Sequence, residues 1–513
     1  MTRPSRTPAQ DDLCSLRAIQ VVDLLKRKDI SPLDLVEASI KRIEAVDTGI
    51  NALPMRRFEQ AREEAKRISY DLEIQNPRSL HGLPIAVKDY NDVAGTPTTY
   101  GSPIFRDHIP KRSDATVQKL QNNGAIVMAK SNVPEWAGGN TFNPVYGATR
   151  NPWNLNLSVG GSSGGSSAAL ASGQVWLATG NDLGGSLRTP ASFNGIVGLR
   201  PTPGLVPRAK RLHASDLLWV EGPMGRCVED VALMLCAGAG HMPDDPLSFE
   251  GDGVLLSELL LKTTLPQRVA FSKDLGEVAI EPEIARICES SLQKLSAMGT
   301  EITGDIPDFR GVMEGFQTLR ALLLAVMMQP ILEEHRDLIA PEIIDNIERG
   351  FKLDVHDIIK AEQIRAGIFH AMMTFFETHD FLICPAASVE PFPVEDRYVK
   401  EINGQTCKTY IDWFSITFLI TMTACPTVCI PCGFTQSGLP VGIQIVGKPR
   451  GEAQLLSFAR QFEESLGIYT RLPVQPNNLK TYKYYWPRKL AFIDRRPVSS
   501  TVITPPTSLP FGP

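Results

Sequence analysis

Two glycine-serine clusters constrain this chain more than any other feature of its sequence. The first reads Gly160-Gly161-Ser162-Ser163-Gly164-Gly165, and the second reads Gly184-Gly185-Ser186. Glycine lets the backbone turn sharply, so that N–H groups can converge on one oxygen, and serines on such turns present reactive hydroxyls. Apolar runs at residues 168–170 and 175–177 separate the clusters, and flexible linkers do not alternate with such runs. We therefore interpret the clusters as structured loops joined by a buried helix and strand.

The composition is that of a large globular protein. The chain has 513 residues, of which 43% are hydrophobic and 21% charged, a balance that supports a large core. Length alone predicts about three domains, but no linker of convincing length divides the chain. The net charge of −5, with both signs interspersed, argues against nucleic acid or an anionic membrane as the main partner.

Short apolar runs alternate with helical patterns along the chain. This alternation predicts an α/β fold, with a central twisted mixed sheet covered by helices on both faces. Ser31, Pro32 and Asp34 predict a capped helix start. The predicted strands cover residues 83–87, 125–129, 268–271, 381–384 and 441–445, and the predicted helices cover 16–28, 32–46, 58–72, 115–121, 284–298, most of 316–376, and 452–466. We expect a helical arm over 1–75, a core over 76–472 and an extension over 473–513.

The cysteines and the apolar segments argue against a metal site and a membrane span. The only close pair among nine cysteines is Cys429 and Cys432, which lies in an apolar run, so we expect reduced, buried thiols and no metal. The longest uncharged run, residues 413–433, contains Pro426 and Pro431 and is predicted to be a core helix followed by a buried strand. The first residues have no apolar signal region, which predicts a cytoplasmic protein.

The two clusters belong to a longer series of motifs that resembles the amidase signature family. The first cluster matches the family's GGSSGGS loop. The turn Asn181-Asp182-Leu183-Gly184-Gly185-Ser186-Leu187-Arg188 follows, and then a segment ending in Gly198-Leu199-Arg200-Pro201-Thr202. Upstream, Gly82-Leu83-Pro84-Ile85-Ala86-Val87-Lys88-Asp89 matches the family's lysine motif. The resemblance implies a single large amidase-signature domain and covers roughly residues 15–470.

The resemblance also implies catalytic roles. Ser186 is the expected nucleophile, Ser162 the bridging serine on a cis peptide, and Lys88 the general base. Ser162 and Ser186 are 24 residues apart, the separation that fatty acid amide hydrolases show. The expected oxyanion hole consists of the N–H groups of Leu183, Gly184, Gly185 and Ser186, and the expected supporting residues are Ser163, Asp182 and Arg188. No cofactor is implied.

Lys88 poses a chemical problem, since a free lysine has a pKa of about 10.4 and is charged at neutral pH. Burial at a strand end disfavours the charged form and lowers the pKa. A carboxylate at Asp89 would oppose this, but adjacent side chains on a strand point to opposite faces. We therefore expect Asp89 to point away from Lys88. Asn181 and Val159 depart from the Thr or Ser and the Pro that the family often has at these positions.

The resemblance implies hydrolysis of a small-molecule amide to a carboxylate and an amine or ammonia, and it is compatible with a homodimer. The acyl group stays open at this stage, as does cleavage of esters or carbamates. An aromatic acyl pocket is suggested by Trp136, Tyr410, Trp413 and Phe414. Packing in the hydrophobic core would explain these aromatic side chains equally well.

Four alternatives remain at this point. The first is the glutaminase component of a tRNA-dependent amidotransferase, which works with partner proteins. The second is an α/β-hydrolase elbow at residues 160–164, although the residues before Ser162 alternate only weakly and no histidine has a matching motif. The third is a phosphate-binding loop, although neither cluster is followed by Gly-Lys-Ser/Thr. The fourth is a catalytically silent family member.

Overall fold

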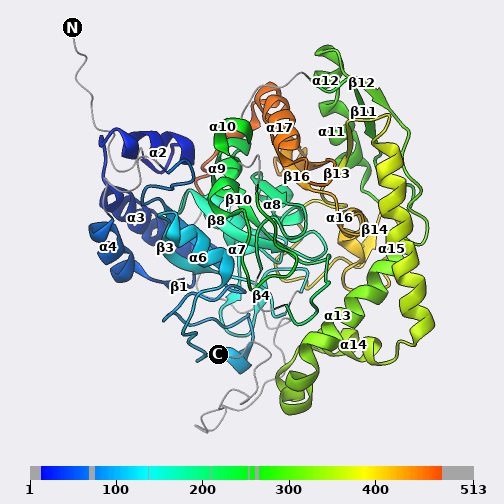
Figure 1. The fold of residues 1–513 in the computed structure, drawn as a ribbon, viewed down its shortest axis with the longest axis horizontal. Coiled ribbons are helices and arrows are strands. Elements are labelled where there is room, and N and C mark those ends of the chain that lie inside the picture. Colours follow the sequence, from blue (N-terminus) through cyan, green and yellow to red (C-terminus); the bar gives the residue numbers. More distant parts are fainter. Residues whose placement is uncertain are drawn as a thin grey trace.

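The computed structural model describes residues 13–68, 76–136, 138–208, 211–251, 255–259 and 265–476 (Figure 1). The predicted extension therefore falls almost wholly outside the described residues, as does the end of the predicted helix at 58–72. The boundaries of the helical arm and the extension stay predictions.

A single mixed sheet of eleven strands forms the centre of the described structure, as the alternating pattern predicts. The strands lie in the order β1 (Met55–Arg56), β3 (Ile126–Ser131), β2 (Pro84–Lys88), β8 (Leu177–Asp182), β10 (Val220–Gly225), β9 (Val197–Arg200), β16 (Thr427–Phe434), β17 (Pro440–Val446), β13 (Phe381–Pro385), β11 (Arg268–Phe271) and β12 (Glu301–Thr303). Strand β2 pairs in parallel with β3 and β8, and β11 pairs in parallel with β13 and β12. The other pairs are antiparallel.

Both faces of the sheet are covered. Along β2, Ile85 and Val87 pack into one apolar core while Ala86 packs into another, because successive strand side chains point to opposite faces. The first core includes side chains from α2 (Ala18–Lys26), α6 (Ala115–Asn122) and α9 (Val228–Gly238). The second includes side chains from α3 (Pro32–Ile50), α4 (Phe58–Arg67) and α7 (Gly164–Ala171).

A group of long helices lies across the molecule from α2–α4 (Figure 1). It consists of α13 (Val312–His335), α14 (Pro341–Phe351) and α15 (Val355–Phe375). The segment Val312–Leu338 is long and apolar enough to cross a bilayer, but 67% of its most apolar window is buried inside the protein. Its apolar side chains Phe316, Leu323 and Ile331 belong to the largest core, so packing within the protein accounts for its composition.

Shorter elements complete the described fold. They are α8 (Thr189–Asn194), α10 (Leu256–Leu259), α11 (Pro282–Ser291), α12 (Gln293–Ala297), α16 (Ser415–Thr421), α17 (Glu452–Leu466), the 3₁₀ turns η1 (Pro103–Phe105), η2 (Arg336–Leu338), η3 (Asp412–Phe414) and η4 (Ile468–Arg471), and the hairpin strands β4 (Phe142–Asn143), β5 (Gly147–Ala148), β6 (Arg150–Asn151), β7 (Asn154–Ser158), β14 (Glu401–Ile402) and β15 (Gln405–Thr406).

Several local predictions are confirmed. Ser31 caps α3, with Pro32 at its first position and Asp34 completing the capping box. The uncharged run at 413–433 forms α16 and the buried strand β16. The predicted helix at 284–298 is instead divided at Leu292 into α11 and α12.

The segment before Ser162 is more regular than its weak alternation indicates. It forms β7, which pairs with β6 in a separate two-stranded sheet. The strand of a nucleophile elbow belongs to the main sheet. This arrangement therefore disfavours the elbow alternative, although a strand does precede Ser162.

All nine cysteines lie in the described ranges as thiols, and each of them except Cys407 is buried. The sulfur of Cys432 lies 3.8 Å from the sulfur of Cys288 on α11. Within the described ranges, no group of three or more His, Cys, Asp or Glu side chains could hold a metal ion.

Gly185 gives a test of how tightly the turn between β8 and α8 is built. Its φ is +131°, and an added Cβ would lie 2.1 Å from Thr417 Oγ1. Gly276 also has a positive φ, +73°, but its Cβ would meet nothing within 4 Å. We expect Gly276→Ala to cost about 1 kcal/mol of unfolding free energy from strain alone. We expect Gly185→Ala to cost ~2 kcal/mol more, because overpacking adds to the strain. Urea denaturation measures both, and equal losses would contradict the close packing against Thr417.

Candidate active site

Lys88 is the last residue of β2 and is fully buried. Its Nζ lies 2.7 Å from Ser162 Oγ, 2.8 Å from Ser163 Oγ and 2.6 Å from Asn181 Oδ1. Since Lys88 follows Val87 on the strand, its side chain points to the same face as Ala86, where α7 packs. The strand therefore delivers the amine to the start of α7.

Ser162 and Ser163 lie at that helix start. Ser163 is the N-cap residue of α7, and the Gly161–Ser162 peptide bond is cis. The helix lies close against its neighbours, since a Cβ on Gly165 would come within 2.3 Å of the Asn132 backbone nitrogen. A larger residue would therefore move the helix away from β3 and the serines away from Lys88.

A buried ion-pair network holds the turn that carries Ser186. Asp182, the last residue of β8, accepts bonds from Arg188 at 3.0 Å on both carboxylate oxygens and from Arg200 at 3.2 Å. It also accepts the backbone N–H groups of Gly185 and Leu187. Burial raises the pKa of Asp182, but the two arginines outweigh burial and lower it to about 2. The carboxylate is therefore ionised at neutral pH and fixes the turn from both ends.

The electrostatics around Lys88 favour its neutral form. Burial lowers the pKa of Lys88 to about 7, while the carboxylates of Glu221 and Asp182 limit the shift. Asp89 does not contribute, because its carboxylate lies 2.9 Å from Lys130 Nζ and accepts the Thr99 hydroxyl. The prediction that Asp89 points away from Lys88 is confirmed. The amine also lies 4.9 Å from the centre of the Tyr90 ring.

Ser162, Asn181 and Ser186 line one pocket. Its other lining residues are Tyr90, Gly138, Leu183, Gly184, Trp219, Phe316, Arg320 and Phe414. Ser162 is buried, whereas Ser186 is partly exposed toward the pocket. The two serines predicted from separate loops, 24 residues apart, therefore border the same space beside Lys88.

The backbone N–H groups of the turn differ in their bonding. Gly185 N donates to Asp182 Oδ1 at 2.8 Å. Within the described part of the chain, no acceptor bonds the N–H groups of Leu183, Gly184 or Ser186. Three of the four N–H groups that the sequence predicts for an oxyanion hole thus have no acceptor among the described residues. The N–H of Gly185 would have to bond the oxyanion and Asp182 at the same time.

The four aromatic residues predicted to line an acyl pocket occupy different places. Phe414 lines the pocket of Ser186, and Trp136 lines the neighbouring pocket described below. Tyr410 lines a third pocket and accepts a bond from Arg320. Trp413 is fully buried in a small core with Phe193 and donates its ring N–H to the Tyr410 carbonyl. Core packing thus accounts for Trp413.

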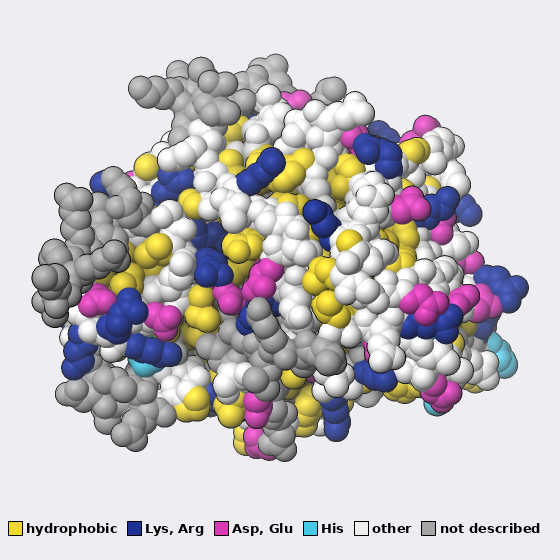
Figure 2. Space-filling view, turned by 90° about the horizontal axis from the view of Figure 1, so that it is seen from above, with side chains coloured by type: hydrophobic (Ala, Val, Ile, Leu, Met, Phe, Trp, Pro, Cys, Tyr) yellow, Lys and Arg dark blue, Asp and Glu magenta, His cyan; other side chains and the backbone are white. Residues whose placement is uncertain are grey.

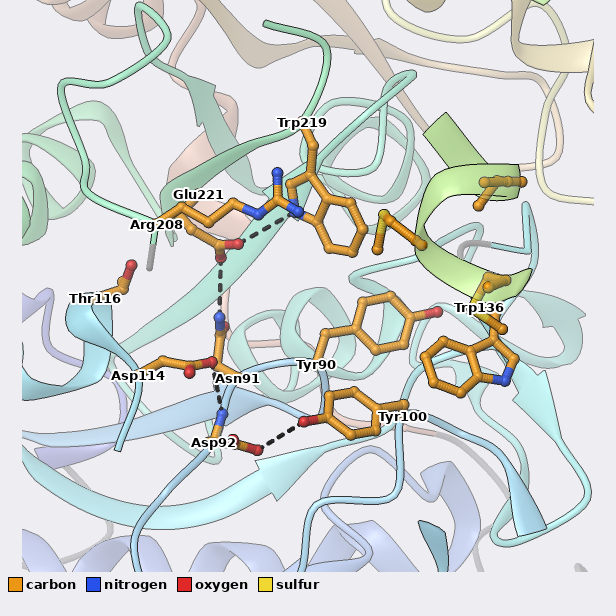
Figure 3. A pocket seen from close by; sticks show the side chains of 13 residues that line it. Tyr90, Asn91, Asp92, Tyr100, Asp114, Thr116, Trp136, Arg208, Trp219 and Glu221 are labelled. Carbon is orange, nitrogen blue, oxygen red and sulfur yellow. Dashed lines mark hydrogen bonds between the residues drawn. The ribbon is translucent and has the colours of Figure 1, made fainter. Parts of the chain in front are cut away.

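A larger pocket adjoins the first and shares Tyr90 and Trp219 with it (Figure 3). One side is aromatic and includes Tyr100 and Trp136. The other is polar, where Glu221 accepts hydrogen bonds from Asn91 and from the Trp219 ring N–H. Sequence reasoning missed Tyr90, Trp219, Glu221, Phe316 and Arg320. Tyr90, two residues after Lys88, and Glu221, which directly precedes the glycine-proline segment at 222–226, lie close enough to sequence motifs to have been found.

The surface carries no extended field of one sign on the face shown in Figure 2. Lysines and arginines alternate with acidic residues across this face. This agrees with the interspersed charges of the sequence.

Comparisons with known proteins identify the class of enzyme and the family to which the fold belongs. A sequence model of the amidase family matches residues 34–456. The chain belongs to the amidase signature family and is an amide C–N hydrolase.

Two curated relatives are equally similar in sequence. An acylamidase of Rhodococcus erythropolis is 32% identical over 88% of this chain and 96% of its own length. A glutamyl-tRNA(Gln) amidotransferase subunit of Moorella thermoacetica is 32% identical over 90% of this chain and 99% of its own length.

Solved structures agree with the family assignment. A bacterial aryl acylamidase has a TM-score of 0.81 and 26% identity, covering 90% of this chain and 98% of its own. A 6-aminohexanoate cyclic dimer hydrolase, bound to substrate, has a TM-score of 0.81 and 25% identity, covering 90% and 100%.

Replacing Asp182 tests the network that holds the turn. Asp182→Asn leaves two buried guanidinium groups without a carboxylate, so we expect a loss of about 3–5 kcal/mol in unfolding free energy. Because the pKa of Asp182 is lowered from 3.8 to about 2 in the folded protein, the part of this stability that depends on ionisation of the carboxylate is complete above pH ~4 and is lost as the pH falls through about 2.

Asp308→Asn is the matched control. Its pKa is also lowered to about 2, by hydrogen bonds from Arg310, but the pair is exposed to solvent and screened. Urea denaturation at pH 7 should show a much smaller change for Asp308→Asn. Equal losses in the two variants would refute the role of burial.

Proposed function

We propose that this enzyme hydrolyses a carboxylic acid amide through a covalent acyl-Ser186 intermediate, with Ser162 as proton relay and Lys88 as general base. The observation that carries the proposal is the buried Lys88 amine, which contacts Ser162 Oγ and has its pKa lowered to about 7. A base of this pKa is matched to work near neutral pH.

The reaction begins with neutral Lys88. The amine takes the proton of Ser162, Ser162 takes the proton of Ser186, and Ser186 Oγ forms a bond to the amide carbon. The resulting oxyanion accepts hydrogen bonds from N–H groups of the turn. Each such donor stabilises the transition state by about 3–4 kcal/mol. As the C–N bond breaks, the relay returns the proton to the leaving nitrogen. Water then cleaves the acyl-enzyme by the same path and releases a carboxylate.

Leu183, Gly184 and Ser186 are the proposed principal donors of the oxyanion hole, because their N–H groups have no other acceptor among the described residues. Gly185 contributes mainly by shaping the turn, since its N–H already bonds Asp182. Ser163 and Asn181 hold the amine of Lys88, and Arg188 positions Asp182.

The alternative function is the glutaminase component of a tRNA-dependent amidotransferase, which the relative from Moorella thermoacetica supports. Glutamine carries an α-ammonium group, which a buried site must pair with an acceptor. The described lining of the Ser186 pocket contains no carboxylate. This favours a stand-alone amidase acting on a small molecule; a cytoplasmic location and a homodimer stay predictions.

Substitution of the three catalytic positions tests the proposal. We expect Ser186→Ala, Ser162→Ala and Lys88→Ala each to lower kcat/KM for a panel of acyl amides and anilides by at least about 10³-fold, because the three act as one unit. Mass spectrometry of the quenched wild-type enzyme should place the acyl group on Ser186.

Ser172→Ala is the matched control, since this buried serine lies at the other end of α7 and its hydroxyl bonds, among the described residues, only helix carbonyls and the Gln174 amide. It should keep more than about a tenth of the activity, as a substitution outside the catalytic unit. Full activity in Ser186→Ala would overturn the nucleophile assignment. Activity that appears only with added partner proteins would establish the amidotransferase alternative.

The pH profile tests the role of Lys88 as a base. Since the neutral amine is the active form, kcat/KM should rise with pH through about 7, the pKa of Lys88 in the free enzyme. Asn181→Asp places a carboxylate beside the amine, stabilises its charged form and should move the rising limb upward by about 1–3 pH units.

Glu221→Gln should move the rising limb of the kcat/KM profile to lower pH, the opposite direction from Asn181→Asp. It removes a carboxylate that raises the pKa of Lys88, so the neutral amine should persist to lower pH. Rate measurements from pH 5 to 10 on both variants would check the two signs. Shifts in the same direction, or none, would show that another group controls the limb.

A further inference from the structure

Among the described residues, one buried charge in the Ser186 pocket has no carboxylate at ion-pair distance. Arg188, Arg200 and Arg320 are among the largest fully buried side chains of the protein. The first two pair with Asp182. Across the described ranges, no carboxylate lies within ion-pair distance of Arg320.

The contacts of Arg320 leave part of its guanidinium unused. Nη2 donates to the Tyr410 hydroxyl at 2.5 Å, and the guanidinium carbon lies 5.3 Å from the centre of that ring. Nη1 is buried and has no hydrogen-bond partner among the described residues. Burial raises the pKa of Tyr410, so its phenol is neutral at pH 7 and does not compensate the charge.

An uncompensated buried guanidinium is costly. Burial of an unpaired charge disfavours folding by several kcal/mol, which is why buried arginines are paired. A ligand that supplied the missing negative charge would recover much of this cost in the bound state. A carboxylate suits this role, because guanidinium N–H groups bond it with charge assistance.

The guanidinium is placed to meet a group on the substrate. Phe316 and Arg320 are four residues apart and lie on one face of α13. Phe316 packs on the nucleophile turn, where a Cβ on Gly184 would lie 3.0 Å from its ring. Arg320 is therefore about one helical turn, ~6 Å, further along the helix. Both residues line the pocket of Ser186, whose described lining contains no carboxylate to repel an anion.

We propose that Arg320 binds a carboxylate of the substrate, so that the preferred substrates are amides carrying a carboxylate a few bonds from the scissile carbonyl. This inference rests on the proposed acyl-Ser186 mechanism. The carboxylate belongs either to the acyl part, as in the monoamide of a short dicarboxylic acid, or to the amine part, as in an N-acyl amino acid. The chemistry that Arg320 recognises is the same in both.

The test compares charged and neutral substrates of similar shape. Succinamate against pentanamide probes the acyl part, and N-acetyl-β-alanine against N-butylacetamide probes the amine part. The readout is the ratio of kcat/KM within each pair. Wild type should prefer the carboxylate by at least about 10-fold in one pair, and Arg320→Gln should lower that ratio by about 10- to 100-fold. Arg320→Lys keeps the positive charge but loses the paired N–H donors of the guanidinium, so its ratio should lie between those of wild type and Arg320→Gln.

Arg336→Gln is the charge control, because it removes a positive charge from an exposed pair with Glu348 just after α13. It should leave the ratio unchanged. The inference would be overturned if wild type showed no preference for the carboxylate in either pair. It would also be overturned if Arg320→Gln lowered kcat/KM equally for the charged and the neutral substrates.

Two further measurements separate the possible failures. Acylation of Ser186 by the neutral ester p-nitrophenyl butyrate, followed by mass spectrometry, tests the mechanism without any carboxylate. If Arg320→Gln does not fold, calorimetric titration of Ser186→Ala with succinamate and with pentanamide decides the question. Binding of succinamate at least about 10-fold more tightly would support the inference, and equal binding would overturn it.

Discussion

The buried carboxylate of Asp182 is the interaction on which the catalytic region depends. It joins the end of β8 to Arg188 at the start of α8 and to Arg200 on β9, and it accepts two N–H groups of the turn between them. Each partner alone would be a buried charge or an unsatisfied donor. Together they hold the backbone so that Ser186 and its neighbouring N–H groups border one pocket. The proposed chemistry therefore uses a turn whose geometry is fixed by groups outside the lining of that pocket.

The same low-dielectric interior that makes this network costly to break makes Lys88 useful. Burial that strengthens the Asp182 pairs also disfavours the charged lysine and brings its pKa to about 7. The carboxylate of Asp89 does not restore the charge on Lys88, because adjacent side chains on a strand point to opposite faces. Asp89 pairs with Lys130 on the other face of the sheet edge, whereas Lys88 meets only neutral oxygens at bonding distance. A carboxylate in place of Asn181 would remove the advantage.

The sequence predicts the parts of the site that are local in the chain. Lys88, Ser162 and Asp182 lie in contiguous motifs with a fixed relation to a strand end or a helix start. Glu221, Phe316 and Arg320 were not predicted, because they reach the site only through the pairing of β10 with β8 and the packing of α13. Trp413 shows the converse, since its position in an aromatic run says nothing of whether it faces a pocket or a core. Strands and helices follow periodicity, but pocket walls depend on contacts between distant segments.

This difference separates the motif residues from the residues of the pocket wall. The motifs hold the proposed reacting atoms, and their carboxylates have partners within the protein: Asp182 has two arginines and Asp89 has a lysine. The pocket wall contributed by α13 has one guanidinium that the described residues leave without a countercharge. Burying that charge is costly, and a carboxylate on the substrate, as proposed above, would compensate it in the bound state. In this enzyme, specificity is therefore to be sought in the unbalanced charge on α13.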